Sequence, residues 1–208
     1  MLKKLSFIVS FTFIFISASY ATEAMKGDNI HARVWNKFIA DSLLLHKKIT
    51  SGKDVIVKKS IGGYAQIKDF YTEYRYFKNG HLLSQLQWEK DNPSQIHSIE
   101  VFVRDNKGRV IRDYMAAYLP YYHNAPTQTL ISFHHYANGL HAFRSFDASG
   151  DMVLERCVGE NKKGQSINMI LDEDDFFNEE DTTMETSEYK ECFVGLKQNQ
   201  LGKYLIPQ

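Results

Sequence analysis

The stretch FYTEYRYFKNGHLLSQLQWE, residues 70–89, determines the class of fold. It holds two runs of residues that suit an extended chain, joined by Asn79-Gly80, the dipeptide most typical of a two-residue hairpin turn. In the first run, aromatic side chains alternate with polar ones, as on a half-buried sheet surface. The stretch therefore predicts an antiparallel β-hairpin.

Comparable runs continue on the C-terminal side as far as Val158, and glycine-containing turns separate them at 105–108, 138–139 and 147–150. Strands joined by such short turns pair with their neighbours in the chain, which predicts an antiparallel meander of about seven strands. The expected strands are 70–77, 82–89, 96–104, 109–118, 130–136, 140–146 and 151–158.

A helix is expected before the sheet, over residues 28–49. Asp28 is a candidate N-cap and Gly52 a candidate stop. An apolar stripe at helical spacing would pack on one face of the sheet. The positions of that stripe are Ile30, Val34, Phe38, Leu45 and Ile49.

The fold class predicted is therefore α+β: an antiparallel meander sheet with an N-terminal helix on one face. A half-open barrel and two small stacked sheets are the alternatives. After Gly159 the composition becomes polar, with an acidic segment at 172–181 that is expected to be a solvated loop rather than a calcium site. A short helix within 182–197 and a loosely held end at 201–208 complete the prediction.

Residues 1–21 have the features of a secretory signal peptide. Lys3 and Lys4 precede an apolar run of about a dozen residues, and small residues at 19 and 21 suit signal peptidase. Cleavage is expected between Ala21 and Thr22, which leaves one globular domain, 22–208, in the periplasm or outside the cell. The alternative is a retained membrane anchor, although the apolar run is short for a span.

The mature chain would carry 23 basic and 25 acidic residues, because two of the 25 basic residues lie in the signal. A net charge of −2 gives no electrostatic reason to expect binding to nucleic acid. No second long apolar run follows the signal, so no membrane span is expected after cleavage.

The chain has two cysteines, Cys157 and Cys192, without the spacing of a zinc or thioredoxin-type motif. In an oxidising compartment two lone cysteines usually pair, so a disulfide is predicted. Two buried free thiols are the alternative.

No familiar catalytic or cofactor motif occurs in the sequence, so no cofactor is predicted. His134 and His135 are neighbours on an expected strand and point to opposite faces. A two-residue turn would place His141 opposite Tyr136, and a three-residue turn would place it opposite His135. Only the second would give a histidine pair, and two ligands fall short of a zinc site, so no metal is expected.

The connection Tyr118–Pro126 is longer than a hairpin needs. Two prolines stiffen it, and its tyrosines offer flat amphipathic contact area. The loop would grip a peptide, a glycan or an envelope protein, or else cover one end of the sheet with its rings turned inward. The candidate binding residues are Tyr118, Tyr121, Tyr122 and His123.

Parts of the chain resemble an uncharacterised family of exported bacterial proteins. The similarity lies in Arg112-Asp113-Tyr114, 117–120, 125–130 and 140–150, and it implies export without an activity. Three hairpin turns, within 77–83, 102–111 and 146–154, are also loosely similar to the repeats of YD-type surface proteins, although turn chemistry alone produces the same pattern.

Two classes of function follow. The first is an exported envelope or periplasmic protein that acts as a non-catalytic binding or interaction module. The second is a small hydrolase with a His/Asp site at the sheet rim, for which Asp113, His123 and His135 are the candidate groups. The absence of a recognisable nucleophile favours the first.

Overall fold

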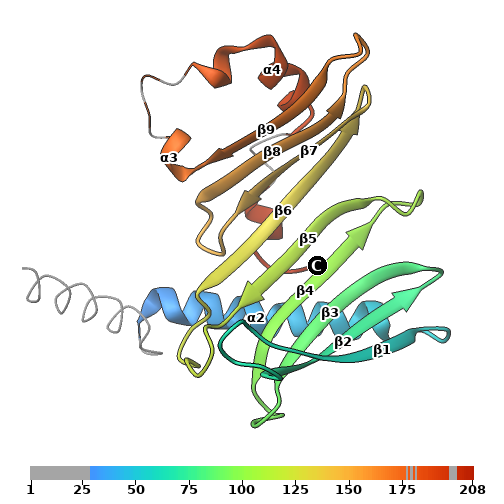
Figure 1. Cartoon of the computed structure of the whole chain (residues 1–208), viewed down its shortest axis with the longest axis vertical. Helices are drawn as coiled ribbons and strands as arrows, with labels where there is room; N and C mark the ends of the chain where they lie inside the picture. The colour runs from blue at the N-terminus through green and yellow to red at the C-terminus, as the bar shows by residue number, and fades with distance from the viewer. Residues whose placement is uncertain (1–28, 177, 179, 181, 197–200) are drawn as a thin grey trace, which may run out of the picture.

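The computed structural model describes residues 29–176, 178, 180, 182–196 and 201–208. Their dominant element is one antiparallel sheet of nine strands in sequential order, β1 to β9 (Figure 1). The strands are β1 Ile56–Gly62, β2 Tyr71–Lys78, β3 His81–Glu89, β4 Ile96–Arg104, β5 Val110–Ala117, β6 Gln128–Ala137, β7 Leu140–Phe146, β8 Met152–Glu160 and β9 Ser166–Asp172.

The predicted meander is confirmed, but the count of about seven strands is too low. The seven expected strands are β2 to β8, and β1 and β9 are additional. Both additional strands lie at the edges of the sheet and are only seven residues long. In β1 nearly every residue is exposed. Burial therefore imposes no strict alternation of apolar and polar residues, which is the pattern by which a strand is found in a sequence.

The helix before the sheet is α2, Ile30–Thr50. Its N-cap is Asn29, whose side chain accepts a hydrogen bond from the backbone N–H of His31 at 2.8 Å. The expected cap, Asp28, lies outside the described residues. Ile30 and Val34 are exposed, contrary to expectation. Residues four apart on a helix are offset by about 40°, so Ile30 is rotated roughly 80° away from the buried Phe38.

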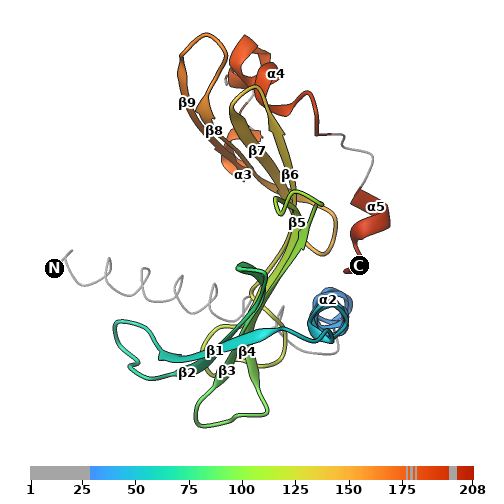
Figure 2. The same ribbon diagram turned by 90° about the vertical axis from the view of Figure 1, so that its right-hand side faces the viewer.

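The helix packs on one face of the sheet, mainly against β3, β4 and β5 (Figure 2). The core at this interface includes Ile99 and Val101 of β4, Tyr114 of β5 and Ile131 of β6, which are fully buried with Phe38 of the helix. This is the main core of the molecule.

A second, smaller core lies further along the same face. It joins β7, β8 and β9 to α4, Ser187–Phe193, and the disulfide between Cys157 and Cys192 lies within it. The strand pairing Ile131↔Phe146 and Ala142↔Cys157 shows that both cores occupy the same side of the sheet, because residues of one strand two apart share a face.

The C-terminal region is more ordered than its polar composition suggested. The acidic segment begins with one helical turn, α3 Glu173–Phe176, and a short 3-10 helix, η1 Thr183–Glu185, precedes α4. The end of the chain forms α5, Leu201–Tyr204, and is not loosely held. Leu201 and Leu205 pack against the main core, and Arg112 donates a hydrogen bond to the carbonyl of Gln208 at 2.5 Å.

The signal peptide and its cleavage point, Ala21-Thr22, lie outside the described residues. Within the part of the chain that the structure describes, no helix combines the length and the apolar character that a membrane crossing requires.

Candidate functional site

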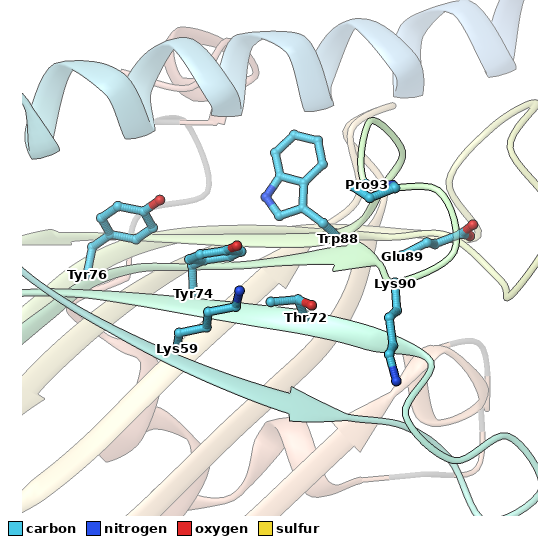
Figure 3. Close-up of a pocket in the computed structure, with 8 residues that line it drawn as sticks. All are labelled: Lys59, Thr72, Tyr74, Tyr76, Trp88, Glu89, Lys90 and Pro93. Carbon is cyan, nitrogen blue, oxygen red and sulfur yellow. The ribbon is translucent and has the colours of Figure 1, made fainter.

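An aromatic groove of about 350 Å³ lies on the helix-covered face of the sheet, over strands β1 to β3. Figure 3 shows Tyr74, Tyr76 and Trp88 standing on this side of the sheet, with α2 above them. The complete lining is Lys59, Thr72, Tyr74, Tyr76, Trp88, Glu89, Lys90 and Pro93.

The local sequence explains why the groove exists. Thr72, Tyr74 and Tyr76 alternate along β2 and therefore share one face. The helix packs mainly on β3 to β5, so it leaves this face of β1 and β2 partly uncovered. His46 on the helix packs in a T-shaped arrangement with Tyr76, one of the lining rings, at a ring-centre distance of 4.6 Å.

One positive charge in the groove, that of Lys59, has no acidic partner among the residues that the structure describes. The ammonium of Lys59 lies 5.5 Å from the ring centre of Tyr74, and no carboxylate of the described residues pairs with it. Lys90, by contrast, lies 3.8 Å from a carboxylate oxygen of Asp69, and its side chain extends away from the aromatic rings (Figure 3). The groove thus offers aromatic faces beside a single available cation.

The tyrosine-rich loop, residues 118–126, lies at the same end of the sheet as Glu89 and Pro93. Tyr118 is buried, with 8% of its surface exposed, so it belongs to the core rather than to an exposed binding surface. The rings of Tyr121 and Tyr122 are 62% and 58% exposed. A binding role would require these two rings to be exposed, as they are. The role itself stays a prediction.

Several contacts hold the loop in one conformation. His123 Nε2 donates to the buried carboxylate of Glu89 at 2.7 Å, and the Asn36 side-chain amide donates to the carbonyl of Asn124 at 2.6 Å. The Tyr118 hydroxyl donates to Asn36 Oδ1 at 2.8 Å. Tyr121 has a φ of 65°, which a tyrosine adopts only where its surroundings require it. The two exposed rings are therefore presented by a preorganised loop.

A cluster of three polar side chains lies on the opposite face of the sheet. Asp113 Oδ2 and His134 Nε2 are 2.5 Å apart, and His134 Nδ1 is 2.9 Å from His141 Nε2. Of the predicted hydrolase residues, the structure places only Asp113 here. His123 is held by Glu89, and His135 faces the other side of the sheet, where it lies against Gly195.

The turn between β6 and β7 has two residues, and His141 pairs with Tyr136. This is the register predicted for a two-residue turn. The inference that this register excludes a histidine pair was wrong. His134 and His141 share a face and touch diagonally, with ring centres 5.1 Å apart. Diagonal neighbours in an antiparallel sheet lie within reach of long side chains.

The donor and acceptor roles in the cluster depend on which ring nitrogens carry protons. With both histidines neutral, His134 donates from Nε2 to an ionised Asp113 and accepts from His141 at Nδ1, and His141 Nδ1 is then a free acceptor. Burial lowers the pKa of His141, and the neighbouring His134 lowers it further. Burial also raises the pKa of Glu100 to about 7, with Asp113 contributing.

The surroundings of the cluster limit what it can do chemically. His141 borders a shallow hollow of about 380 Å³ with Arg109 and Tyr136. Among the described residues, no hydroxyl or thiol is hydrogen-bonded to His134 or His141, and no group of three metal-ligating side chains comes together. The cluster is a candidate proton acceptor without a protein nucleophile.

The groove was not predicted from the sequence. The alternation of Thr72, Tyr74 and Tyr76 was visible, but the same pattern describes any half-buried strand. Only the position of the helix shows that these rings are left partly uncovered.

No protein-family model, no curated protein and no solved structure matches this chain significantly. The resemblance to exported bacterial proteins and to YD-type repeats therefore stays a prediction.

Proposed function

We propose that the chain is an exported, non-catalytic binding module, periplasmic or secreted, and that its aromatic groove holds a glycan that carries a carboxylate. The observation that carries this proposal is the combination of Tyr74, Tyr76 and Trp88 with the unpaired ammonium of Lys59. Small-molecule sites are typically concave and aromatic, with a few polar groups that fix orientation, and about 350 Å³ lies within their usual size range.

The ligand class follows from the chemistry of the lining. The negative face of an aromatic ring attracts the partly positive C–H groups on the face of a sugar ring. The exposed ammonium of Lys59 would pair with a carboxylate of a ligand that lies against the rings. The disulfide supports export, because such bonds persist in oxidising compartments.

Calorimetric titration with trigalacturonate, and with uncharged maltotriose for comparison, tests the proposal. The acidic trisaccharide should bind, and Tyr74→Ala and Lys59→Met should each weaken its binding. Lys58→Met is the matched control, because Lys58 lies next to Lys59 but faces the other side, over Phe77. Equal binding of both sugars, or equal effects of the two lysine variants, would remove the carboxylate from the proposal.

The chain of Asp113, His134 and His141 favours a second candidate, a small hydrolase. His141 Nδ1 would accept a proton from water while the water oxygen attacks an ester carbonyl carbon, and the departing alkoxide would take that proton. Hydrolysis of p-nitrophenyl acetate should then fall in His141→Gln and stay unchanged in His135→Gln. Identical rates in the two variants would exclude this role.

A further inference from the structure

The first strand of the sheet, β1, has an open outer edge. It pairs with β2 along all seven of its residues, and no other strand of the described residues pairs with it. In an antiparallel edge strand, alternate residues point their backbone N–H and C=O groups away from the sheet. Such an edge can accept a further strand through main-chain hydrogen bonds.

The two edges of the sheet differ in how well they are covered. In β9, Ile167 and Leu171 are buried, and α3 lies against this strand. In β1, six of the seven residues are exposed, and Gly62 is half-buried. Both edges lack a further strand among the described residues, and β1 is the more exposed of the two.

The side chains of β1 on the groove side form a simple pattern. Val57, Lys59 and Ile61 pair with Tyr76, Tyr74 and Thr72, so all three share the groove face. Val57 is 49% exposed and Ile61 is 56% exposed, which leaves two large apolar side chains in water on either side of a lysine. A strand added antiparallel to β1 would meet an apolar, a cationic and an apolar position in turn.

The charge of β1 argues against a second copy of this chain as the occupant. Antiparallel self-pairing about the middle of the strand places Lys58 or Lys59 opposite a lysine of the other copy. Like charges directly opposite each other destabilise a pair of strands, and lysines on an edge are a common protection against such self-association.

We infer that β1 is a docking edge for an extended segment of a partner protein, with the pattern apolar–x–acidic–x–apolar. The acidic side chain would lie opposite Lys59, and the apolar side chains opposite Val57 and Ile61. This interaction surface shares Lys59 with the glycan groove and extends beyond it, because Val57 and Ile61 do not line the groove.

Fluorescence anisotropy with labelled acetyl-TVTETVT-amide and its lysine analogue TVTKTVT tests the inference. The glutamate peptide should bind at least about fivefold more tightly than the lysine peptide, and Lys59→Glu should reverse this preference. Lys107→Glu, in the turn between β4 and β5, is the control for net charge. An unchanged preference in Lys59→Glu would overturn the inference.

Amide hydrogen exchange identifies the surface used. Saturation with the glutamate peptide should slow exchange at alternate residues of β1 and leave β9 unchanged. Protection confined to another strand, or a dimer that already protects β1 without peptide, would contradict the inference.

The replacement of Val57 and Ile61 together by Asn separates this surface from the groove. The double variant should lose the peptide and retain trigalacturonate, whereas Tyr74→Ala should lose trigalacturonate and retain the peptide. Failure of one ligand to bind therefore leaves the test of the other intact.

Discussion

Asp113 and His134 contact each other diagonally across β5 and β6, with 2.5 Å between Asp113 Oδ2 and His134 Nε2, although the residue directly opposite Asp113 is Ser132. The contact orients His134 so that its Nδ1 lies 2.9 Å from His141 Nε2. Two neighbours in this region, Asp113 and Glu100, are both acidic. Their proximity leads to a prediction about the pH dependence of stability.

The Glu100 carboxyl is expected to make the protein less stable as the pH rises. Its pKa is raised from 4.5 to about 7, first by burial and then by the nearby Asp113. The native state therefore holds this proton more tightly than the unfolded chain does. The stabilisation is complete below about pH 4.5 and is lost as the pH approaches about 7. Glu100→Gln should raise the free energy of unfolding by up to about 3 kcal/mol near pH 8, and much less near pH 4.

Urea denaturation of both proteins at the two pH values measures this difference. Glu188→Gln serves as the control, since Glu188 is fully exposed and its pKa is lowered rather than raised. An equal effect of Glu100→Gln at both pH values would show that the carboxyl is not protonated in the native state.

The exposed tyrosines of the loop should be removable with little loss of stability. Tyr121→Ala combined with Tyr122→Ala is expected to lower the melting temperature only slightly, because both rings lie mostly in water. Tyr118→Ala is the contrasting variant. It empties a buried site and breaks the hydrogen bond to Asn36, and should cost about 3–5 kcal/mol. A large loss of stability in the double variant would assign the two rings to packing and end their candidacy as a binding surface.

The buried ion pair between Arg144 and Glu155 should be costly to break from one side. Glu155 is fully buried and also accepts a hydrogen bond from the Tyr189 hydroxyl at 2.8 Å. Glu155→Gln would leave the Arg144 charge buried without its partner, which typically costs about 3–5 kcal/mol. Chemical denaturation gives the value, with Glu160→Gln at the exposed end of the same strand as control. A loss below about 1 kcal/mol would indicate that solvent or another group neutralises Arg144.

The disulfide should contribute measurably to stability. It closes a segment with a sequence separation of 35 between Cys157 and Cys192 and ties α4 to the sheet. Replacing both cysteines by Ser is expected to lower the free energy of unfolding by about 3–4 kcal/mol in the chain-entropy model. Reduction of the unmodified protein should have a similar effect. Alkylation of both thiols without prior reduction would show that the bond does not form.

Export should leave a defined N-terminus. If residues 1–21 are a cleaved signal, mass spectrometry of the periplasmic or secreted fraction will find chains that begin at Thr22. Recovery of the full-length chain in the membrane pellet would show that the segment is retained as an anchor.

Local patterns in the sequence are sufficient to predict the sequential meander and the central strands. Asn79-Gly80 and Asn138-Gly139 are local turn signals, and both occur at hairpin turns of the structure, where all four residues have positive φ. Alternation along β4 and β7 located those strands to the residue, since burial on one face imposes a period of two. The pairing of Cys157 with Cys192 followed from their number and the expected compartment.

The tertiary structure alone decided where the candidate sites lie. Strand β1 has little burial, so no alternation of buried and exposed positions marks it in the sequence, and its place in the sheet depends on pairing with β2. The position of α2 leaves Tyr74 partly uncovered, and a diagonal contact joins Asp113 to His134 rather than to His135. These relationships depend on distances between residues far apart in the chain, whereas periodicity and turn chemistry report only on neighbours within a few residues.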